Sequence, residues 1–140
     1  MDTETTVTLM TTELGRVRTS ALCRAFGWQV EVDGLVAYVL LRPRQHREQA
    51  FLLRASFDDF PWRAPSFAFV DRTTYQPHDT AWPPGVRHGS QPPGICTPGT
   101  REFHEHYHLN DAQYRWEPER YPFLQTLAEI HRRLEQGLRS

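Results

Sequence analysis

Hydrophobic and polar positions alternate in four short stretches in the first half of the chain. Each stretch is rich in β-branched and aromatic residues, and turn-forming residues separate it from the next. Asp33-Gly34, between the first two, is typical of a hairpin turn because both residues tolerate the positive φ angles that such turns need. The pattern predicts an antiparallel meander of four strands: Trp28–Val32, Leu35–Leu41, Ala50–Phe57 and Ser66–Val70.

Apolar residues at helical spacing predict a helix before these strands. Thr11 or Thr12 is the expected N-cap, and Gly27 has the properties of a C-cap. The Thr-rich segment Met1–Met10 is expected to be frayed at its start. The apolar positions of this helix are Leu14, Val17, Ala21, Leu22 and Ala25.

The last segment, Tyr121–Leu138, predicts an amphipathic helix with Pro122 in its first turn. Glu129 and Arg133 have the spacing of an i,i+4 ion pair. A helix, four strands and a helix define an α+β fold with one face of the sheet covered. A chain of 140 residues fits a single domain, residues 1–140.

Composition narrows the class of protein. Hydrophobic residues make up 39% and aromatic residues 12%, which is typical of a packed globule. A net charge of −1 gives no electrostatic footprint for nucleic acid or an anionic membrane, so neither is an expected partner. No apolar run could cross a bilayer, and the acidic N-terminus is unlike a signal peptide. With two cysteines far apart, these features predict a cytoplasmic protein with reduced thiols.

Groups that could act as nucleophile, base or metal ligand are concentrated in one segment, Pro92–Leu109. Cys96 lies in a Pro/Gly-rich loop, where a thiol is accessible and a nearby histidine could lower its pKa or act as base. The polar residues that follow are Glu102, His104, Glu105, His106 and His108. The other histidines, His46, His88 and His131, are expected at the surface.

The order of elements and three short motifs resemble the ubiquitin-conjugating enzyme (UBC) fold. Phe60–Phe69 resembles the family's Tyr-Pro-x-x-Pro-Pro segment before the fourth strand, and Gly94-Ile95-Cys96 resembles its Gly-x-Ile-Cys segment. Trp116-Glu117-Pro118 before a helix resembles its Trp-Ser-Pro. The resemblance implies an N-terminal helix, a four-stranded antiparallel meander, a long active-site loop and a C-terminal helix. It also implies a thioester-forming Cys96.

Two departures from the family pattern are informative. The family's His-Pro-Asn tripeptide, whose asparagine is thought to support the oxyanion during lysine attack, is missing. The nearest candidate is Gln76-Pro77-His78-Asp79, which makes His78 a candidate catalytic residue. Extra sequence also separates Cys96 from Trp116. Both departures suit divergent bacterial proteins of this fold that occur beside ubiquitin-like modifiers.

The extra sequence also resembles the predicted metal-binding CEHH family of bacterial ubiquitin-like systems, which is named for its four residues. By order, those residues are Cys96, Glu102, His104 and His108, although Glu105 or His106 could replace one of them. Thiolate, carboxylate and two imidazoles form a reasonable tetrahedral zinc set. His104 and His108 would also face one way on an α-helix, and together with Glu105 they match the short zinc-protease pattern H-E-x-x-H.

Three hypotheses follow. In the first, the protein is an enzyme that carries the C-terminus of a ubiquitin-like protein as a thioester on Cys96, with His104 or His78 assisting. In the second, it is a zinc-binding accessory protein in which Cys96 is a ligand. In the third, it is a non-catalytic adaptor for the modifier or its activating enzyme. All 16 basic side chains are arginine, so the chain offers no lysine as an accidental acyl acceptor.

Overall fold

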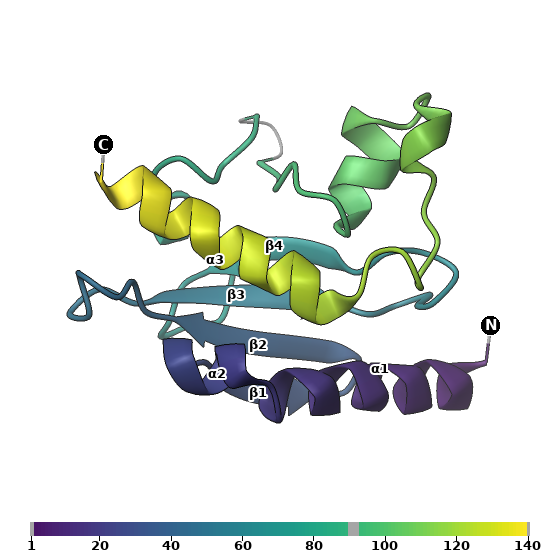
Figure 1. Ribbon diagram of the computed structural model, residues 1–140, viewed down its shortest axis with the longest axis horizontal. Coiled ribbons are helices and arrows are strands. Elements are labelled where there is room, and N and C mark those ends of the chain that lie inside the picture. Colours follow the sequence, from purple (N-terminus) through teal and green to yellow (C-terminus); the bar gives the residue numbers. More distant parts are fainter. Residues whose placement is uncertain (1, 90–92, 140) are drawn as a thin grey trace.

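The computed structural model describes residues 2–89 and 93–139, and it has an α+β architecture (Figure 1). The four strands form one antiparallel sheet in the order β1-β2-β3-β4, so each strand pairs with its neighbour in the sequence. The predicted meander flanked by an N-terminal and a C-terminal helix is therefore confirmed. The main elements are α1 (Thr3–Arg18), α2 (Ala21–Phe26), β1 (Gln29–Asp33), β2 (Val36–Leu41), β3 (Phe51–Ser56), β4 (Ser66–Val70) and α3 (Phe123–Arg139).

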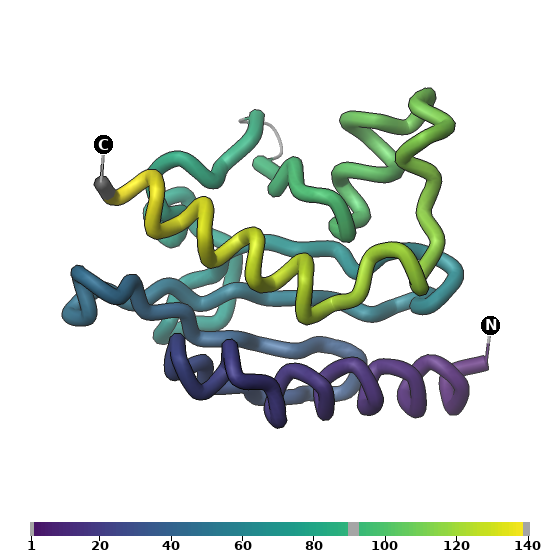
Figure 2. Tube along the Cα trace, in the orientation of Figure 1, coloured from purple at the N-terminus to yellow at the C-terminus, as the bar shows by residue number. Residues whose placement is uncertain are grey.

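A long connection joins β4 to α3 and carries the candidate site. Figure 2 shows it as the teal and green part of the trace, which passes over the β4 edge of the sheet and then rises beside the start of α3. It contains three short helices, which are Asp79–Ala81, Phe103–Tyr107 and Ala112–Tyr114. The predicted long irregular loop before Cys96 is confirmed in the residues that the structure describes.

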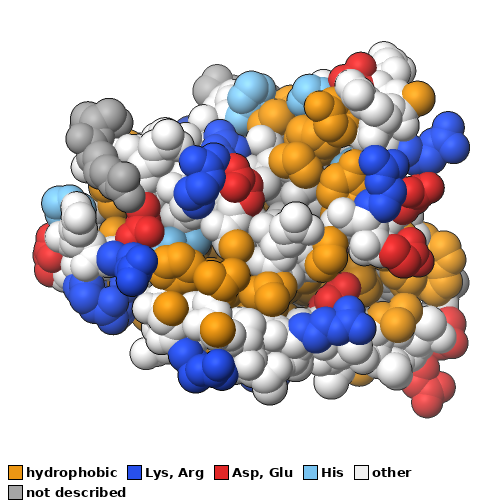
Figure 3. All heavy atoms as spheres, in the orientation of Figure 1, with side chains coloured by type: hydrophobic (Ala, Val, Ile, Leu, Met, Phe, Trp, Pro, Cys, Tyr) orange, Lys and Arg blue, Asp and Glu red, His pale blue; other side chains and the backbone are white. Residues whose placement is uncertain are grey.

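The face that carries α3 shows charged side chains of both signs. On this face arginines and acidic residues alternate with hydrophobic side chains, and neither sign forms a continuous patch (Figure 3). Histidine side chains lie at its upper edge, in the region of the green segment of Figure 1.

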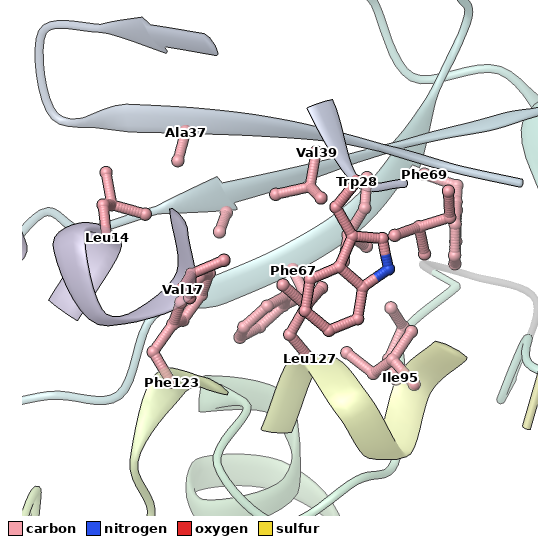
Figure 4. Packing of buried hydrophobic residues seen from close by; sticks show 14 of the residues in the cluster. Leu14, Val17, Trp28, Ala37, Val39, Phe67, Phe69, Ile95, Phe123 and Leu127 are labelled. Carbon is pink, nitrogen blue, oxygen red and sulfur yellow. The ribbon is translucent and has the colours of Figure 1, made fainter. Parts of the chain in front are cut away.

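The core lies between the sheet and the two long helices, which cover the same face (Figure 4). Leu14 from α1, Val39 from β2 and Leu127 from α3 are each at most 2% exposed. Such close burial of apolar surface supplies most of the stabilisation of a domain of this size. Ile95, which precedes Cys96, is 0% exposed in the same cluster, so the candidate loop is anchored in the core.

The start of the N-terminal helix was predicted wrongly. It begins at Thr3 rather than near Thr11, with Asp2 as N-cap accepting a 3.1 Å hydrogen bond from the Glu4 amide. Thr6 is buried and donates a 2.7 Å hydrogen bond to the Phe60 carbonyl, so this threonine belongs to the core boundary instead of a frayed end. The helix also ends at Arg18, and a second short helix follows it.

Candidate functional site

Cys96 lies in a loop that packs on α3 and is hydrogen-bonded to it. Its neighbours Ile95 and Thr97 are buried, whereas Cys96 itself is half-buried. The Arg133 guanidinium donates to the Cys96 carbonyl at 2.9 Å and to Thr97 Oγ1 at 2.7 Å. The expected ion pair of Arg133 with Glu129 is therefore wrong: Arg133 binds this loop, and Glu129 pairs with Arg132 at 2.6 Å.

The thiol of Cys96 is not activated in the free protein. Partial burial raises its pKa above the ordinary range, and the positive charge of Arg133 only partly opposes that effect. The Cys96 side chain is therefore mainly a protonated thiol at neutral pH, because burial disfavours the charged thiolate.

His104 is a structural histidine in this conformation. It is 5% exposed, its Nε2 accepts a 3.0 Å hydrogen bond from the Gly99 amide, and its Nδ1 lies 2.6 Å from the Tyr114 carbonyl. Since Nε2 is an acceptor, the proton resides on Nδ1 and is donated to Tyr114. Burial lowers the pKa of His104, which keeps the ring neutral. Both ring nitrogens are thus used within the fold and neither is free to act as a base on Cys96.

Glu102 connects the segment after Cys96 to the start of β4. Its carboxylate accepts hydrogen bonds from Ser66 Oγ at 2.6 Å and from the Phe67 amide at 3.1 Å. These partners lie more than 30 residues earlier in the chain, so the pairing could not be read from local sequence. Glu102 therefore stabilises the position of the segment and satisfies the amide of Phe67, the second residue of the edge strand β4.

His108 is separated from His104 by an unusual helical turn. Phe103–Tyr107 form a π-helix, and the His108 amide donates to the Phe103 carbonyl at 2.9 Å, an i→i+5 bond. The expected α-helical facing of His104 and His108 is not formed, because a π turn rotates successive residues differently. His108 Nδ1 instead lies 2.8 Å from an Asp111 carboxylate oxygen.

Glu105, the alternative metal ligand or base, forms an ion pair with Arg63. The Arg63 guanidinium contacts both of its carboxylate oxygens, at 2.9 and 2.7 Å. This bidentate pair lowers the pKa of Glu105 and ties the π-helix to the connection between β3 and β4.

The four residues of the expected CEHH set do not form a metal site in this conformation. Within residues 2–89 and 93–139, no group of three or more His, Cys, Asp or Glu side chains is arranged to hold a metal ion. Glu102 and His104 would have to give up the hydrogen bonds described above before they could bind zinc. The donor set therefore does not fit a resident zinc ion here, and zinc binding stays a prediction.

Metal analysis of the purified protein tests that prediction directly. If Cys96 and His108 are ligands, the protein should contain about one zinc, with Zn–S near ~2.3 Å and Zn–N near ~2.0–2.1 Å by X-ray absorption. Cys96→Ser and His108→Ala should each lower the zinc content, while His46→Ala, at an exposed turn, should not. A protein that takes up no zinc from a zinc-buffered solution would exclude the metal hypothesis.

His78, a candidate for catalysis, lies in a different environment from Cys96. Its Nδ1 accepts a 3.2 Å hydrogen bond from the Thr80 amide and lies 2.9 Å from the Thr80 hydroxyl. The described residues that line the pocket beside His78 include Trp82 but not Cys96. The structure therefore does not show His78 as a partner of the thiol.

Tyr107 is a residue that the sequence reasoning missed. Its hydroxyl donates to the His88 carbonyl at 3.2 Å, and a Cβ added to Gly94 would lie 2.5 Å from that hydroxyl. Burial is the main cause of the raised pKa of Tyr107, and the charges of Glu102 and Cys96 also raise it. A phenol group therefore lies over the Gly94 backbone within electrostatic reach of the thiol. Nothing in the local sequence distinguishes this tyrosine, because its placement depends on the π-helix.

A second feature is a shallow groove beside α1. It has a volume of about 400 Å³ and is lined by residues of α1, of the Phe60-Pro61 turn and of the segment before α3. Leu9, which lines the groove, is 37% exposed, and Trp62, which follows Pro61 but does not line the groove, is 53% exposed. The groove could receive an apolar segment of a partner protein.

Comparison with known proteins adds no family to this description. No protein-family model matches the sequence, and a search of curated proteins likewise finds no match. In the part of the chain that the structure describes, no helix has the length and apolar character needed to span a membrane.

Proposed function

We propose that the protein belongs to a bacterial ubiquitin-like modification pathway and carries the C-terminus of a ubiquitin-like protein as a thioester on Cys96. The observation that best supports this proposal is the position of Cys96, half-buried between two buried neighbours in a loop clamped by Arg133. A rigidly held but accessible sulfur suits a covalent carrier. The UBC-like order of helix, meander, cysteine loop and helix gives further support.

The chemistry needs two acyl transfers. In the first, the Cys96 thiolate attacks the thioester carbonyl on the activating enzyme, a new C–S bond forms, and the enzyme's thiolate leaves. In the second, an acceptor amine attacks the Cys96 thioester, an amide forms and the Cys96 thiolate leaves after the amine has lost a proton. Each step passes through an oxyanion. The hydroxyl of Tyr107 lies beside the loop, and it could support the oxyanion only by giving up its single hydrogen bond to the His88 carbonyl.

The raised pKa of Cys96 has a consequence for this reaction. Little thiolate is present in the free protein at neutral pH, so loading should accelerate as pH rises toward and above the usual thiol value of about 8.5. A thiol with a raised pKa is also less prone to stray alkylation and oxidation, which suits a carrier that receives an already activated acyl group.

The partners of the proposal are a ubiquitin-like protein and its activating enzyme. The groove between α1 and Pro61 is the surface on which we place a contact of the activating enzyme, since its lining combines apolar side chains with the Glu13–Arg16 ion pair. Absence of lysine means that no internal side-chain amine can capture the acyl group.

Incubation with the activating enzyme, ATP and the modifier tests the proposal. We expect an adduct that a reducing agent destroys. Cys96→Ser should abolish it or convert it to an ester that resists the reductant, whereas Cys23→Ser should leave it intact. A wild-type protein that never forms a reducible adduct with its cognate activating enzyme would exclude the carrier role.

An adaptor that binds these partners without chemistry is the second candidate. The raised pKa of Cys96 and the apolar groove beside α1 favour it, because binding needs the groove but not a thiolate. In that case Cys96→Ser should bind the activating enzyme as wild type does. Leu9→Ala should weaken binding without destabilising the fold, since Leu9 lines the groove and is 37% exposed.

A further inference from the structure

Arg54 lies at the centre of the sheet face that the helices leave uncovered. Its neighbours in β3, Leu53 and Ala55, are 0% exposed in the core, so the alternation of a strand directs Arg54 to the opposite face. Tyr38 of β2 and Ala68 of β4 are its cross-strand partners. An arginine at the middle of a sheet is expected to have an acidic partner.

The Arg54 guanidinium lacks such a partner on one of its nitrogens. Within residues 2–89 and 93–139, the buried Nε of Arg54 has no hydrogen-bond acceptor. More than nine in ten buried polar groups of native proteins are paired, so an unpaired one requires an explanation, such as strain, a bound water or an ion. The remaining charge of Arg54 is likewise only partly solvated, because its side chain is half-buried.

Glu31 and Asp79 both interact with residues other than Arg54. Glu31, in the same cross-strand row, accepts a 3.0 Å hydrogen bond from the Tyr75 hydroxyl. Asp79 pairs with Arg87 at 3.2 Å. Tyr75 lies in the loop after β4, where its backbone has a φ of 63°. Its ring packs edge-on against the Tyr38 ring, with 4.8 Å between the ring centroids. Neither Glu31 nor Asp79 therefore pairs with Arg54, although Asp79 lines the same pocket as Arg54.

A pocket of about 500 Å³ adjoins Arg54 at the β4 edge of the sheet. That volume lies within the range of about 300–1,000 Å³ that is typical of small-molecule sites. Trp82, Pro77 and Pro93 form apolar walls. His78 forms a polar wall of the pocket. Because its Nδ1 accepts a hydrogen bond from the Thr80 amide, the neutral imidazole has its N–H donor at Nε2.

We propose that this pocket binds a small molecule bearing an oxyanion, either a carboxylate or a phosphate, through the Arg54 guanidinium. The planar guanidinium matches both oxyanions with two parallel hydrogen bonds, which its terminal nitrogens can donate end-on, because the Nε itself is buried. Trp82 provides an aromatic face for the body of the ligand. The site is independent of Cys96, so this inference does not rest on the proposed thioester chemistry.

The test uses the full chain and two aromatic probes, phenyl phosphate and benzoate, with neutral benzamide as control. Binding is followed by NMR on the Arg54 Nε–H, whose burial should keep it visible. We expect saturable shifts with at least one oxyanion and none with benzamide. Shifts with phenyl phosphate alone, or with benzoate alone, identify the natural oxyanion as phosphate or carboxylate respectively.

Two variants separate specific binding from general electrostatics. Arg54→Gln should weaken binding about tenfold or more, because hydrogen bonds to charged groups contribute on this scale. Arg18→Gln removes the same charge from an exposed position on α1 and should bind as wild type does. Circular dichroism checks that Arg54→Gln is folded, and the Trp82 indole N–H reports binding in that variant. Equal weakening in both variants, or no saturable shift with either oxyanion, would overturn the proposal.

Discussion

Replacing Gly99 with alanine should destabilise the protein by about 3 kcal/mol, measured as the free energy of unfolding in urea. Two effects add here. Gly99 has a φ of 104°, a backbone conformation that an L-residue adopts only with strain. A Cβ at this position would also lie 2.9 Å from Thr126 Cβ and 3.0 Å from Thr126 Cγ2, and closer still to Thr126 Oγ1.

The loop cannot easily retreat from this clash. Thr126 donates a 3.2 Å hydrogen bond to the Pro98 carbonyl, and the Gly99 amide donates to His104. Moving Gly99 away from α3 would therefore strain two bonds that hold the loop after Cys96. We also expect the Gly99→Ala variant to load Cys96 poorly in the adduct assay.

Gly15→Ala is the matched control. Gly15 lies within α1, and a Cβ there meets nothing within 4 Å. Alanine should therefore stabilise the protein by about 0.5–1 kcal/mol, because it lowers the entropy of the unfolded chain and favours the helix. Thr126→Ala should partly rescue Gly99→Ala by removing Oγ1 and Cγ2, leaving the 2.9 Å contact with the Cβ of residue 126 and the backbone strain. An unchanged stability of Gly99→Ala would show that the close packing of Gly99 on α3 is wrong.

The strands could be predicted from sequence because their signals are local. Alternation with period 2 defines each strand, and the Asp33-Gly34 turn separates the first two, without reference to the rest of the chain. Both ends of each observed strand agree with the prediction to within one residue. The start of α1 at Thr3 could not be predicted because threonine has a low intrinsic helix propensity, so a Thr-rich segment does not by itself indicate a helix. In the folded protein Thr8 and Thr12 bond back to carbonyls four residues earlier, and Thr6 bonds to Phe60.

The sequence groups the candidate residues in one segment, but it does not show which of them are engaged in hydrogen bonds within the fold. Local order grouped Cys96 with the acidic and histidine residues after it, and the segment does form one unit beside the Cys96 loop. The partners of Glu102, Arg133 and His104 are separated from them by between 5 and 37 residues, and no spacing rule connects such pairs. Hydrogen bonds across the fold thus decide which side chains remain free for chemistry.

His131 is the clearest example of a role set by distant residues. It was expected at the surface but is 0% exposed. The Trp28 indole donates a 2.9 Å hydrogen bond to His131 Nδ1, and the Phe26 ring stacks on the imidazole at 4.1 Å. Both partners come from the α2–β1 region, about 100 residues earlier, so the helical pattern of α3 alone could not reveal them.

Acidification from pH 7.5 to 5.5 should destabilise the protein through His131 and His104. Burial lowers the pKa of His131, with the positive charge of Arg44 adding to that effect and Glu135 opposing it. Because Nδ1 accepts from Trp28, the neutral ring has its proton on Nε2, which lies 3.7 Å from a Glu135 oxygen. Protonation of His131 at Nδ1 would turn this acceptor into a donor facing the Trp28 indole N–H, so the hydrogen bond between the two rings would break.

The sign of the effect follows from proton linkage. In the unfolded chain a histidine binds a proton below about pH 6.5, whereas a buried histidine with a lowered pKa does so only at lower pH. The unfolded state therefore holds more protons in this window, and the free energy of unfolding falls as pH falls. Each such histidine contributes a slope of up to about 1.4 kcal/mol per pH unit. The stabilisation is fully present above about pH 6.5 and is lost as the pH drops through the two pKa values.

Urea unfolding of wild type and His131→Gln at several pH values measures this slope. Glutamine can accept from the Trp28 indole but does not titrate, so the variant should lose up to half of the pH dependence, with His104 providing the rest. His46→Gln, at an exposed turn, should keep the wild-type slope. If wild type has the same stability at pH 7.5 and 5.5, or if His131→Gln keeps the full slope, then His131 is not the buried neutral group that links α3 to Trp28.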